Sequence, residues 1–393
     1  MKQIVRRAKA KAQTAVIGSA LSLLGRPYLR RRAQERLKHA GLILMFHHVA
    51  PRRPDRLTIN RGLEILPETL ERILNSLKAQ NYDIVPMDAV PERLSQGSSE
   101  RRFAALTFDD GGRDNLIHAA PILRRHEAPF TVYVTTNFTS GLSAPWWHVV
   151  ERAVLAARAL RIDAGQGMRF FDTSDHPAKN RAAEALHDIL WRADDQMRAR
   201  LTAELGAQSG LDLTALTREL CMDWNELRDI AALPGCALGA HTMTHANLAQ
   251  LDEHAAMREI SEARDEIRAR LGVAVNHFAY PYGAPGCCEA REFELVRKAG
   301  FVTAVTTRRG VLACADIHRL TSLPRAPING CYQHPPMVDA LVSGLPFALA
   351  EQSRALMASI RNGVRRPVAD EQSRASAPRL KPDHTGLTSQ PAP

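Results

Sequence analysis

Residues 103–112 read FAALTFDDGG, an apolar run that ends in two carboxylates and two glycines. Such a run is typical of a strand buried on both faces, and Gly111 and Gly112 allow the chain to turn sharply where the strand ends. Two carboxylates at a buried strand end repel each other, so Asp109 and Asp110 need a cation or a shared proton. The alternative is a simple turn or helix-cap pair, such as Asp194-Asp195 in a polar stretch. We favour a functional site at this strand end.

Short apolar runs alternate with helical stretches on both sides of this segment. The runs that we interpret as strands are residues 41–49 (GLILMFHHV), 82–85, 103–108, 130–135, 236–240, 277–280, 301–305 and 320–323. The helix predicted at 252–271 has one apolar stripe, at Met257, Ile260, Ala263, Ile267 and Leu271. Strands separated by single helices predict a parallel sheet with right-handed crossovers, and about seven strands are enough to close a barrel. The expected fold class is α/β, a distorted (β/α) barrel with about seven parallel strands.

The alternation also suggests where the parts of the chain begin and end. Residues 41–335 are expected to form the barrel, interrupted at 139–220 by a mostly helical insertion that opens with Trp146 and Trp147. Residues 336–362 suggest a closing helix. Residues 363–393 are rich in Pro, Ser, Arg and Gln and are expected to be disordered.

The positive charge is concentrated at the N-terminus. Of the 52 Lys and Arg residues, 11 lie within residues 1–40 beside a single acid, and the rest of the chain carries 41 charges of each sign. A neutral body argues against nucleic acid as a partner. A basic helix on an anionic membrane surface accounts for the arm, and a solvated charged helix is the alternative. We expect a cytoplasmic protein with peripheral contact at the inner face of the membrane, although 14–25 could also be a weak secretory signal.

Polar side chains gather at the predicted strand ends. They are His47-His48, Asp109-Asp110, the histidines of HTMTH at 241–245, and Tyr282. The H-x-x-x-H spacing places two imidazoles on one face of a turn, although it is weak evidence alone. Two neutral imidazoles and one carboxylate can hold a divalent metal while leaving positions open for water and substrate.

Three of these motifs together resemble a known family. TFDDG (107–111), HTMTH (241–245) and FAYPYG (278–283) are similar, in this order and at strand ends, to the motifs of the polysaccharide deacetylases with a NodB-type domain, carbohydrate esterase family four. The resemblance covers about residues 41–330. It implies that Asp110, His241 and His245 bind a metal, usually zinc, with cobalt, nickel or manganese as alternatives. It also implies that Asp109 is the catalytic base, that Pro281 shapes a substrate-binding loop, and that the backbone N–H at Tyr282 binds the oxyanion.

The sequence departs from the family pattern in two places. The third motif often opens with an arginine that orients the base, and here that position is Ala279. Arg325 is a candidate substitute, and an ordinary surface arginine is the alternative. The family's Leu-x-His motif, which supplies the general acid, is also missing, and His318 and His334 are candidates only by residue type.

A permuted branch of the family, acting on poly-N-acetylglucosamine, places the acid histidine on its first strand after a tyrosine. Phe46-His47 resembles that pair, so we expect His47 to be the acid; the alternative is a buried core histidine. Trp146 and Trp147 could stack on sugar rings or anchor the insertion.

The expected function is metal-dependent hydrolysis of N-acetyl groups from N-acetylhexosamine-containing poly- or oligosaccharides, of the chitooligosaccharide or poly-N-acetylglucosamine type. The alternatives are a catalytically weak carbohydrate-binding protein of the same fold and an O-acetyl esterase acting on xylan-like glycans. A P-loop, a G-x-G-x-x-G after a strand and a G-x-S-x-G elbow are absent from the sequence, so a nucleotide-binding or serine-hydrolase function has no support.

Overall fold

The structure, a computed structural model, describes residues 2–36, 39–53, 56–96 and 101–364. The chain divides into two compact units, Met1–Glu351 and Gln352–Pro393. In the second unit, the described residues form the end of helix α15 (Leu345–Val364). From residue 365 on, the tail for which disorder is expected lies outside the described residues.

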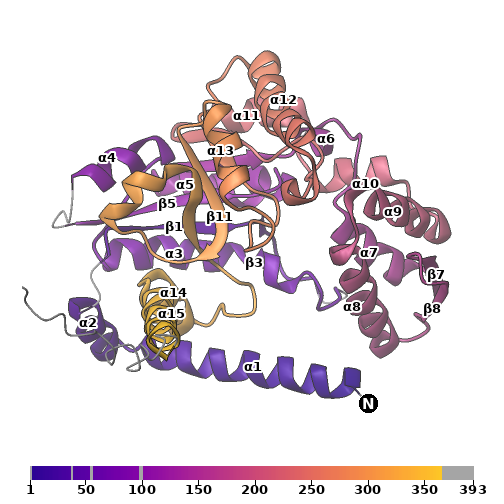
Figure 1. The fold of residues 1–393 in the computed structure, drawn as a ribbon, viewed down its shortest axis with the longest axis horizontal. Coiled ribbons are helices and arrows are strands. Elements are labelled where there is room, and N and C mark those ends of the chain that lie inside the picture. The colour runs from indigo at the N-terminus through magenta and orange to yellow at the C-terminus, as the bar shows by residue number, and fades with distance from the viewer. Residues whose placement is uncertain (1, 37–38, 54–55, 97–100, 365–393) are drawn as a thin grey trace, which may run out of the picture. The chain divides into compact units, whose positions relative to one another are not determined.

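Seven parallel strands form a closed barrel in the first unit (Figure 1). In barrel order they are β1 (Gly41–Phe46), β12 (Leu323–Pro327), β11 (Thr303–Arg309), β10 (His277–Ala279), β9 (Cys236–Ala240), β6 (Phe130–Val134) and β5 (Arg102–Phe108). The barrel closes because β5 pairs with β1 along six residues, from Gly41 opposite Phe103 to Phe46 opposite Phe108. The short strand β4 (Tyr82–Ile84) extends the sheet beside the start of β5. The expected barrel is confirmed.

Alternate residues of these strands belong to two different hydrophobic clusters. One cluster joins the strands to the surrounding helices and contains Leu42, Leu44, Leu106, Phe108 and Val132. The other contains their neighbours in the opposite phase, Ile43, Ala105, Tyr133, Ala279 and Val305, which point to the barrel interior. Both faces of each strand are therefore apolar, which explains the continuous hydrophobic runs in the sequence.

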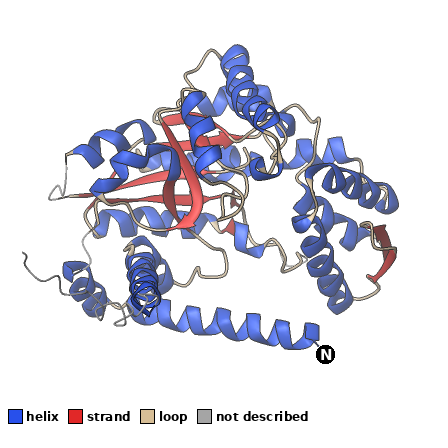
Figure 2. Ribbon diagram, viewed as in Figure 1, coloured by secondary structure: helices blue, strands red, loops and turns tan. Residues whose placement is uncertain are grey.

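Helices cover the outside of the strands, as Figure 2 shows. They are α3 (Pro67–Ala79), α4 (Val90–Ser95), α5 (Ala120–Arg125), α11 (Trp224–Ala231), α12 (Glu253–Leu271) and α13 (Ala290–Lys298). The predicted stripe of α12 is confirmed, because Ile260, Ala263 and Ile267 are buried and Met257 and Leu271 pack against the same core.

The insertion has a hydrophobic core of its own. Its helices are α6 (Thr136–Thr139), α7 (Trp146–Ala156), α8 (His176–Arg192), α9 (Asp195–Ser209) and α10 (Leu213–Leu220). They share a cluster that includes Trp147, Leu186 and Leu205. Between α7 and α8 the chain forms an antiparallel hairpin, β7 (Ala159–Asp163) with β8 (Met168–Asp172), which the sequence analysis did not predict.

Two further predictions about local structure need correction. Residues 320–323 were expected to be a strand, but most of them belong to the 3-10 turns of Cys314–Ser322, and β12 begins only at Leu323. The Asp316 carboxylate accepts the backbone N–H of Ala313 (2.8 Å) and caps these turns. The closing segment 336–362 forms two helices, α14 (Pro335–Val342) and α15, because Gly344 adopts a positive φ of 74° between them.

The basic arm forms two helices, α1 (Lys2–Leu24) and α2 (Pro27–Arg36). Leu21 of α1 is buried in the main core, and Gly18 lies close to Met337 of α14. Val16 and Leu23 of α1 and Tyr28 of α2 are exposed. Among the described residues, no helix has both the length and the apolar character needed to cross a membrane.

The buried His39, just before β1, predicts a pH-dependent stability. Its Nε2 lies 3.3 Å from both the Ser343 carbonyl and the Tyr82 hydroxyl, and burial, with Arg102 nearby, lowers the pKa of His39 to about 4. The unfolded chain takes up this proton more readily, so stability is lost as the pH falls from 6.5 toward 4. Between pH 8 and pH 5, His39→Gln should lose about 2 kcal/mol less unfolding free energy than the wild type. Urea titrations at both pH values measure this difference, and equal losses would contradict it.

Candidate active site

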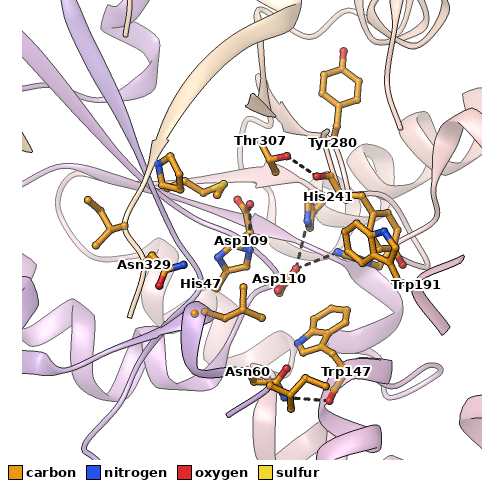
Figure 3. Close-up of a pocket in the computed structure, with 18 of the residues that line it drawn as sticks. His47, Asn60, Asp109, Asp110, Trp147, Trp191, His241, Tyr280, Thr307 and Asn329 are labelled. Carbon is orange, nitrogen blue, oxygen red and sulfur yellow. Dashed lines mark hydrogen bonds and ion pairs between the residues drawn. The ribbon is translucent and has the colours of Figure 1, made fainter. Parts of the chain in front are cut away.

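The carboxyl ends of the barrel strands meet around one cavity of about 380 Å³. Its lining includes His47 after β1, Asp109 and Asp110 after β5, and His241 and His245 after β9. In Figure 3, His47 and Asn329 lie to one side of Asp110, and Trp191 of the insertion lies to the other. The barrel therefore assembles the polar residues that the sequence places at strand ends.

Asp110, His241 and His245 form a buried cluster. The Oδ1 atom of Asp110 lies 3.4 Å from Nε2 of each histidine, a distance too long for a good hydrogen bond. The candidate ligand atoms of the three residues all lie within 4.8 Å of one another. No described residue satisfies Asp110 Oδ1 with a hydrogen bond. An orphaned buried carboxylate oxygen facing two imidazole nitrogens fits a divalent metal.

The orientation of His241 and the ionised carboxylate of Asp110 suit metal binding; burial alone would lower the pKa of His241, but Asp110 raises it. The Nδ1 atom of His241 lies 2.7 Å from the Ala279 carbonyl; since a carbonyl only accepts, Nδ1 carries the proton and Nε2 is directed at Asp110. Burial alone would raise the pKa of Asp110, but the two imidazoles hold it well below its usual range. Burial lowers the pKa of His245. The cluster therefore offers a carboxylate and a correctly oriented imidazole.

The loop that carries the two histidines is held by Glu259 of α12. Thr242 and His245 have positive φ values of 60° and 62°, which are unfavourable for non-glycine residues. Glu259 Oε2 accepts the backbone N–H groups of Met243 (2.9 Å) and Thr244 (3.0 Å), and Oε1 accepts the Thr244 hydroxyl (2.9 Å). The sequence analysis missed Glu259, because it lies in no motif and looks like any charged residue on the polar face of a helix.

Asp109 is paired with Arg325. The guanidinium donates from Nη1 and Nη2 to the two carboxylate oxygens, both at 2.7 Å, and from Nε to the Thr306 carbonyl at 2.9 Å. Arg325 is fully buried, with 0 % of its surface exposed, so it is not a surface arginine. Burial would raise the pKa of Asp109, but Arg325 lowers it below its usual range. Arg325 thus supplies the charged partner of Asp109 that Ala279 cannot supply.

His47 is the nearest imidazole to Asp109, with Nε2 at 3.9 Å from Oδ2. It lines the cavity and is partly exposed there, which distinguishes it from a packed core histidine. Burial lowers its pKa. His318 and His334, the candidates by residue type, are exposed and do not line the cavity.

Tyr282 and the two tryptophans of α7 form one wall of the cavity. The Tyr282 hydroxyl accepts the indole N–H of Trp146 (3.1 Å), and its carbonyl accepts the Thr307 hydroxyl (2.6 Å). The rings of Tyr282 and Trp147 each lie 5.0 Å from the ring of His245. Trp146 and Trp147 belong to the core of the insertion and also line the cavity. The pair therefore anchors the insertion, and stacking on a sugar ring stays a prediction. Pro281 is buried and outside the lining.

A second histidine pair links the insertion to the barrel. His48 Nδ1 lies 3.1 Å from Oδ1 of Asp114, and its Nε2 lies 3.0 Å from Nε2 of His148 on α7. Burial lowers the pKa of His148 far below its usual value, whereas Asp114 outweighs burial and raises that of His48. One shared proton satisfies this contact, which fixes the start of α7 beside the site.

The buried Asp109–Arg325 pair yields a stability prediction. Arg325→Met leaves a buried carboxylate without its partner, which should lower the free energy of unfolding by about 3–5 kcal/mol. Arg297→Met is the matched control, because it breaks only the exposed pair with Glu294 and should leave the free energy of unfolding nearly unchanged. Urea unfolding of both variants, and of Arg325→Met combined with Asp109→Asn, measures the pair. A loss below about 1 kcal/mol for Arg325→Met would contradict it.

Comparisons with known proteins agree with the motifs. A family model described as polysaccharide deacetylase matches residues 96–157 and 175–304, and the residues between these ranges contain the whole β7–β8 hairpin. No curated protein matches the chain.

Similar solved structures include the Streptococcus pyogenes deacetylase PplD in complex with acetate, with 19% identity over 74% of this chain and 92% of that chain, at a TM-score of 0.49. IcaB from Ammonifex degensii has 17% identity over 78% and 98%, at a TM-score of 0.48. The deacetylase domain of BpsB from Bordetella bronchiseptica has 15% identity over 73% and 95%, at a TM-score of 0.45. Together with the motifs at 107–111, 241–245 and 278–283, the match to the family model shows that the chain belongs to the polysaccharide deacetylase family.

Proposed function

We propose that the chain hydrolyses N-acetyl groups of N-acetylhexosamine-containing poly- or oligosaccharides, such as chitooligosaccharides or poly-N-acetylglucosamine, at a divalent metal site. The observation that carries the proposal is the cluster of Asp110, His241 and His245, with an unsatisfied carboxylate oxygen, directly beside the Asp109–Arg325 pair. Asp110, His241 and His245 would hold the metal, zinc being the first candidate and cobalt, nickel or manganese the others. When bound, such a cation polarises the acetamide carbonyl and lowers the pKa of water.

Asp109 is the proposed general base. Its carboxylate lines the cavity next to Asp110 and is kept ionised and oriented by the two hydrogen bonds from Arg325. An ionised, fixed carboxylate can take a proton from the attacking water. The presence of Arg325 also favours an enzyme over a catalytically weak binding protein, because the base does not lack its orienting partner.

His47 and Tyr282 complete the proposed reaction. His47 faces the cavity from the end of β1 and would give a proton to the leaving amine. The backbone N–H of Tyr282 would donate to the developing oxyanion, in a loop held by the hydroxyl of Thr307. A neutral acetylated sugar needs no basic cleft, which agrees with the balanced charge outside residues 1–40.

Variants of the cluster test the metal site and the acid separately. Asp110→Ala and His245→Ala should lose stoichiometric metal in elemental analysis, with acetate release falling to background. His47→Ala should keep its metal but release acetate at least about 100-fold more slowly. His254→Ala, which removes an exposed histidine of α12, is the matched control and should retain both metal and activity.

The substrates for this assay are chitin oligomers, poly-N-acetylglucosamine, peptidoglycan and acetylxylan, each with and without chelator. Full metal content in Asp110→Ala and His245→Ala would refute the ligand set, and near-wild-type release by His47→Ala would refute the acid. Release from acetylxylan alone would favour the O-acetyl esterase, and binding without any release would favour the carbohydrate-binding protein.

We also propose that residues 1–40 rest on an anionic membrane surface, such as the inner face of the cytoplasmic membrane. The support is the concentration of basic residues together with exposed Val16, Leu23 and Tyr28. Each basic residue near such a surface contributes about 1 kcal/mol, so Arg31→Glu with Arg32→Glu should weaken co-sedimentation with anionic vesicles at least about tenfold. The control pair, Arg258→Glu with Arg297→Glu, changes the same charge elsewhere. Equal binding by both double variants would refute the proposal.

A further inference from the structure

Trp191 is the large aromatic side chain of the insertion that presents its surface to the cavity. It lies at the end of α8, lines the cavity, and is 45% exposed. Trp146 and Trp147 line the same cavity but are only 5% and 6% exposed, because they are packed into the core of the insertion. An exposed apolar ring at the rim of a polar cavity marks a contact with a ligand rather than with the core.

The ring of Trp191 is part of a stack that reaches the metal cluster. His187, one turn earlier on α8, lies parallel to it at 6.0 Å and 16°. The ring of Tyr282 lies perpendicular to that of Trp191, with centroids 5.0 Å apart at 86°, and Tyr282 in turn contacts His245 at 5.0 Å. Trp191 is therefore one ring away from His245 and lies on the side of Asp110 opposite His47 (Figure 3).

The position of Trp191 is fixed by its surroundings. The buried Arg198 of α9 donates to the carbonyls of Leu190 (2.9 Å) and Ala193 (2.6 Å), which flank Trp191 in the chain. The same guanidinium lies 5.2 Å from the centre of the Tyr282 ring. The end of α8 is thus tied to the loop that carries Tyr282, and a ring held in place loses little entropy when a ligand stacks on it.

We propose that Trp191, supported by His187 and Tyr282, is a binding subsite for the pyranose ring that neighbours the residue being deacetylated. This inference rests on the proposed function and names the part of the substrate that the insertion recognises. One face of a β-linked pyranose presents C–H groups, which stack on a flat indole. The polar side chain of Asn329 lines the same cavity and supplies an amide group for hydrogen bonds to sugar hydroxyls. The subsite makes the site selective for oligomers over the single sugar.

The test compares a β-1,4-linked N-acetylglucosamine pentamer with N-acetylglucosamine itself. In Trp191→Ala, the ratio of kcat/KM for the pentamer to that for the monosaccharide should fall about tenfold, chiefly through the KM of the pentamer. Trp191→Phe keeps a flat ring and should recover part of this ratio. Phe170→Ala removes a ring that is 76% exposed on the hairpin, outside the cavity lining, and should leave the ratio unchanged.

A binding measurement separates this inference from the proposed reaction. Calorimetric titration of the metal-loaded His47→Ala protein with the pentamer should show a Kd about tenfold lower than that of His47→Ala with Trp191→Ala. An active wild type whose ratio and Kd do not respond to Trp191→Ala would overturn the subsite and leave the proposed function standing. A wild type that releases no acetate, but loses pentamer affinity in Trp191→Ala, would overturn the reaction and support the subsite.

Discussion

The ion pair between Asp109 and Arg325 is the interaction on which the rest of the site depends. Asp109 follows β5 and Arg325 lies on β12, and these strands lie on opposite sides of β1. The pair therefore forms only when the barrel is closed around β1. A fully buried guanidinium and a buried carboxylate are each costly alone, so barrel closure and charge compensation require each other. Both direct the Asp109 carboxylate into the cavity.

The barrel and the insertion contribute different properties to the cavity. The strand ends supply the carboxylates and imidazoles, held by backbone pairing and by Glu259 on α12. The insertion supplies aromatic surface from α7 and α8 and has its own hydrophobic core. The His48–His148 contact and the Trp146–Tyr282 hydrogen bond join the two parts. The proposed chemistry thus belongs to the barrel, and the proposed recognition of a longer substrate belongs to the insertion.

Local sequence patterns predicted the elements that depend on periodicity. The barrel strands are buried on both faces and therefore appear as continuous apolar runs. The strand predicted at 320–323 was mostly wrong, because Cys314–Ser322 contains apolar residues but folds into turns capped by Asp316. Glu259 and Trp191 were not predicted, for a related reason. Nothing in the neighbouring sequence indicates that Glu259 supports a strained loop or that Trp191 faces a cavity, because charged and aromatic residues are common on amphipathic helices.

The sequence by itself determined the alternation of strands and helices, and with it the meeting of Asp109, Asp110, His241 and His245, because parallel strands bring their carboxyl ends to one edge. Only the tertiary structure showed that Arg325 is buried beside Asp109, that His47 lines the cavity and that the tryptophan pair packs in the core of the insertion. Arg325 lies 216 positions from Asp109 in the chain, and their contact depends on barrel closure and strand register. Those quantities arise from packing across the whole domain, so no short segment of the chain encodes them.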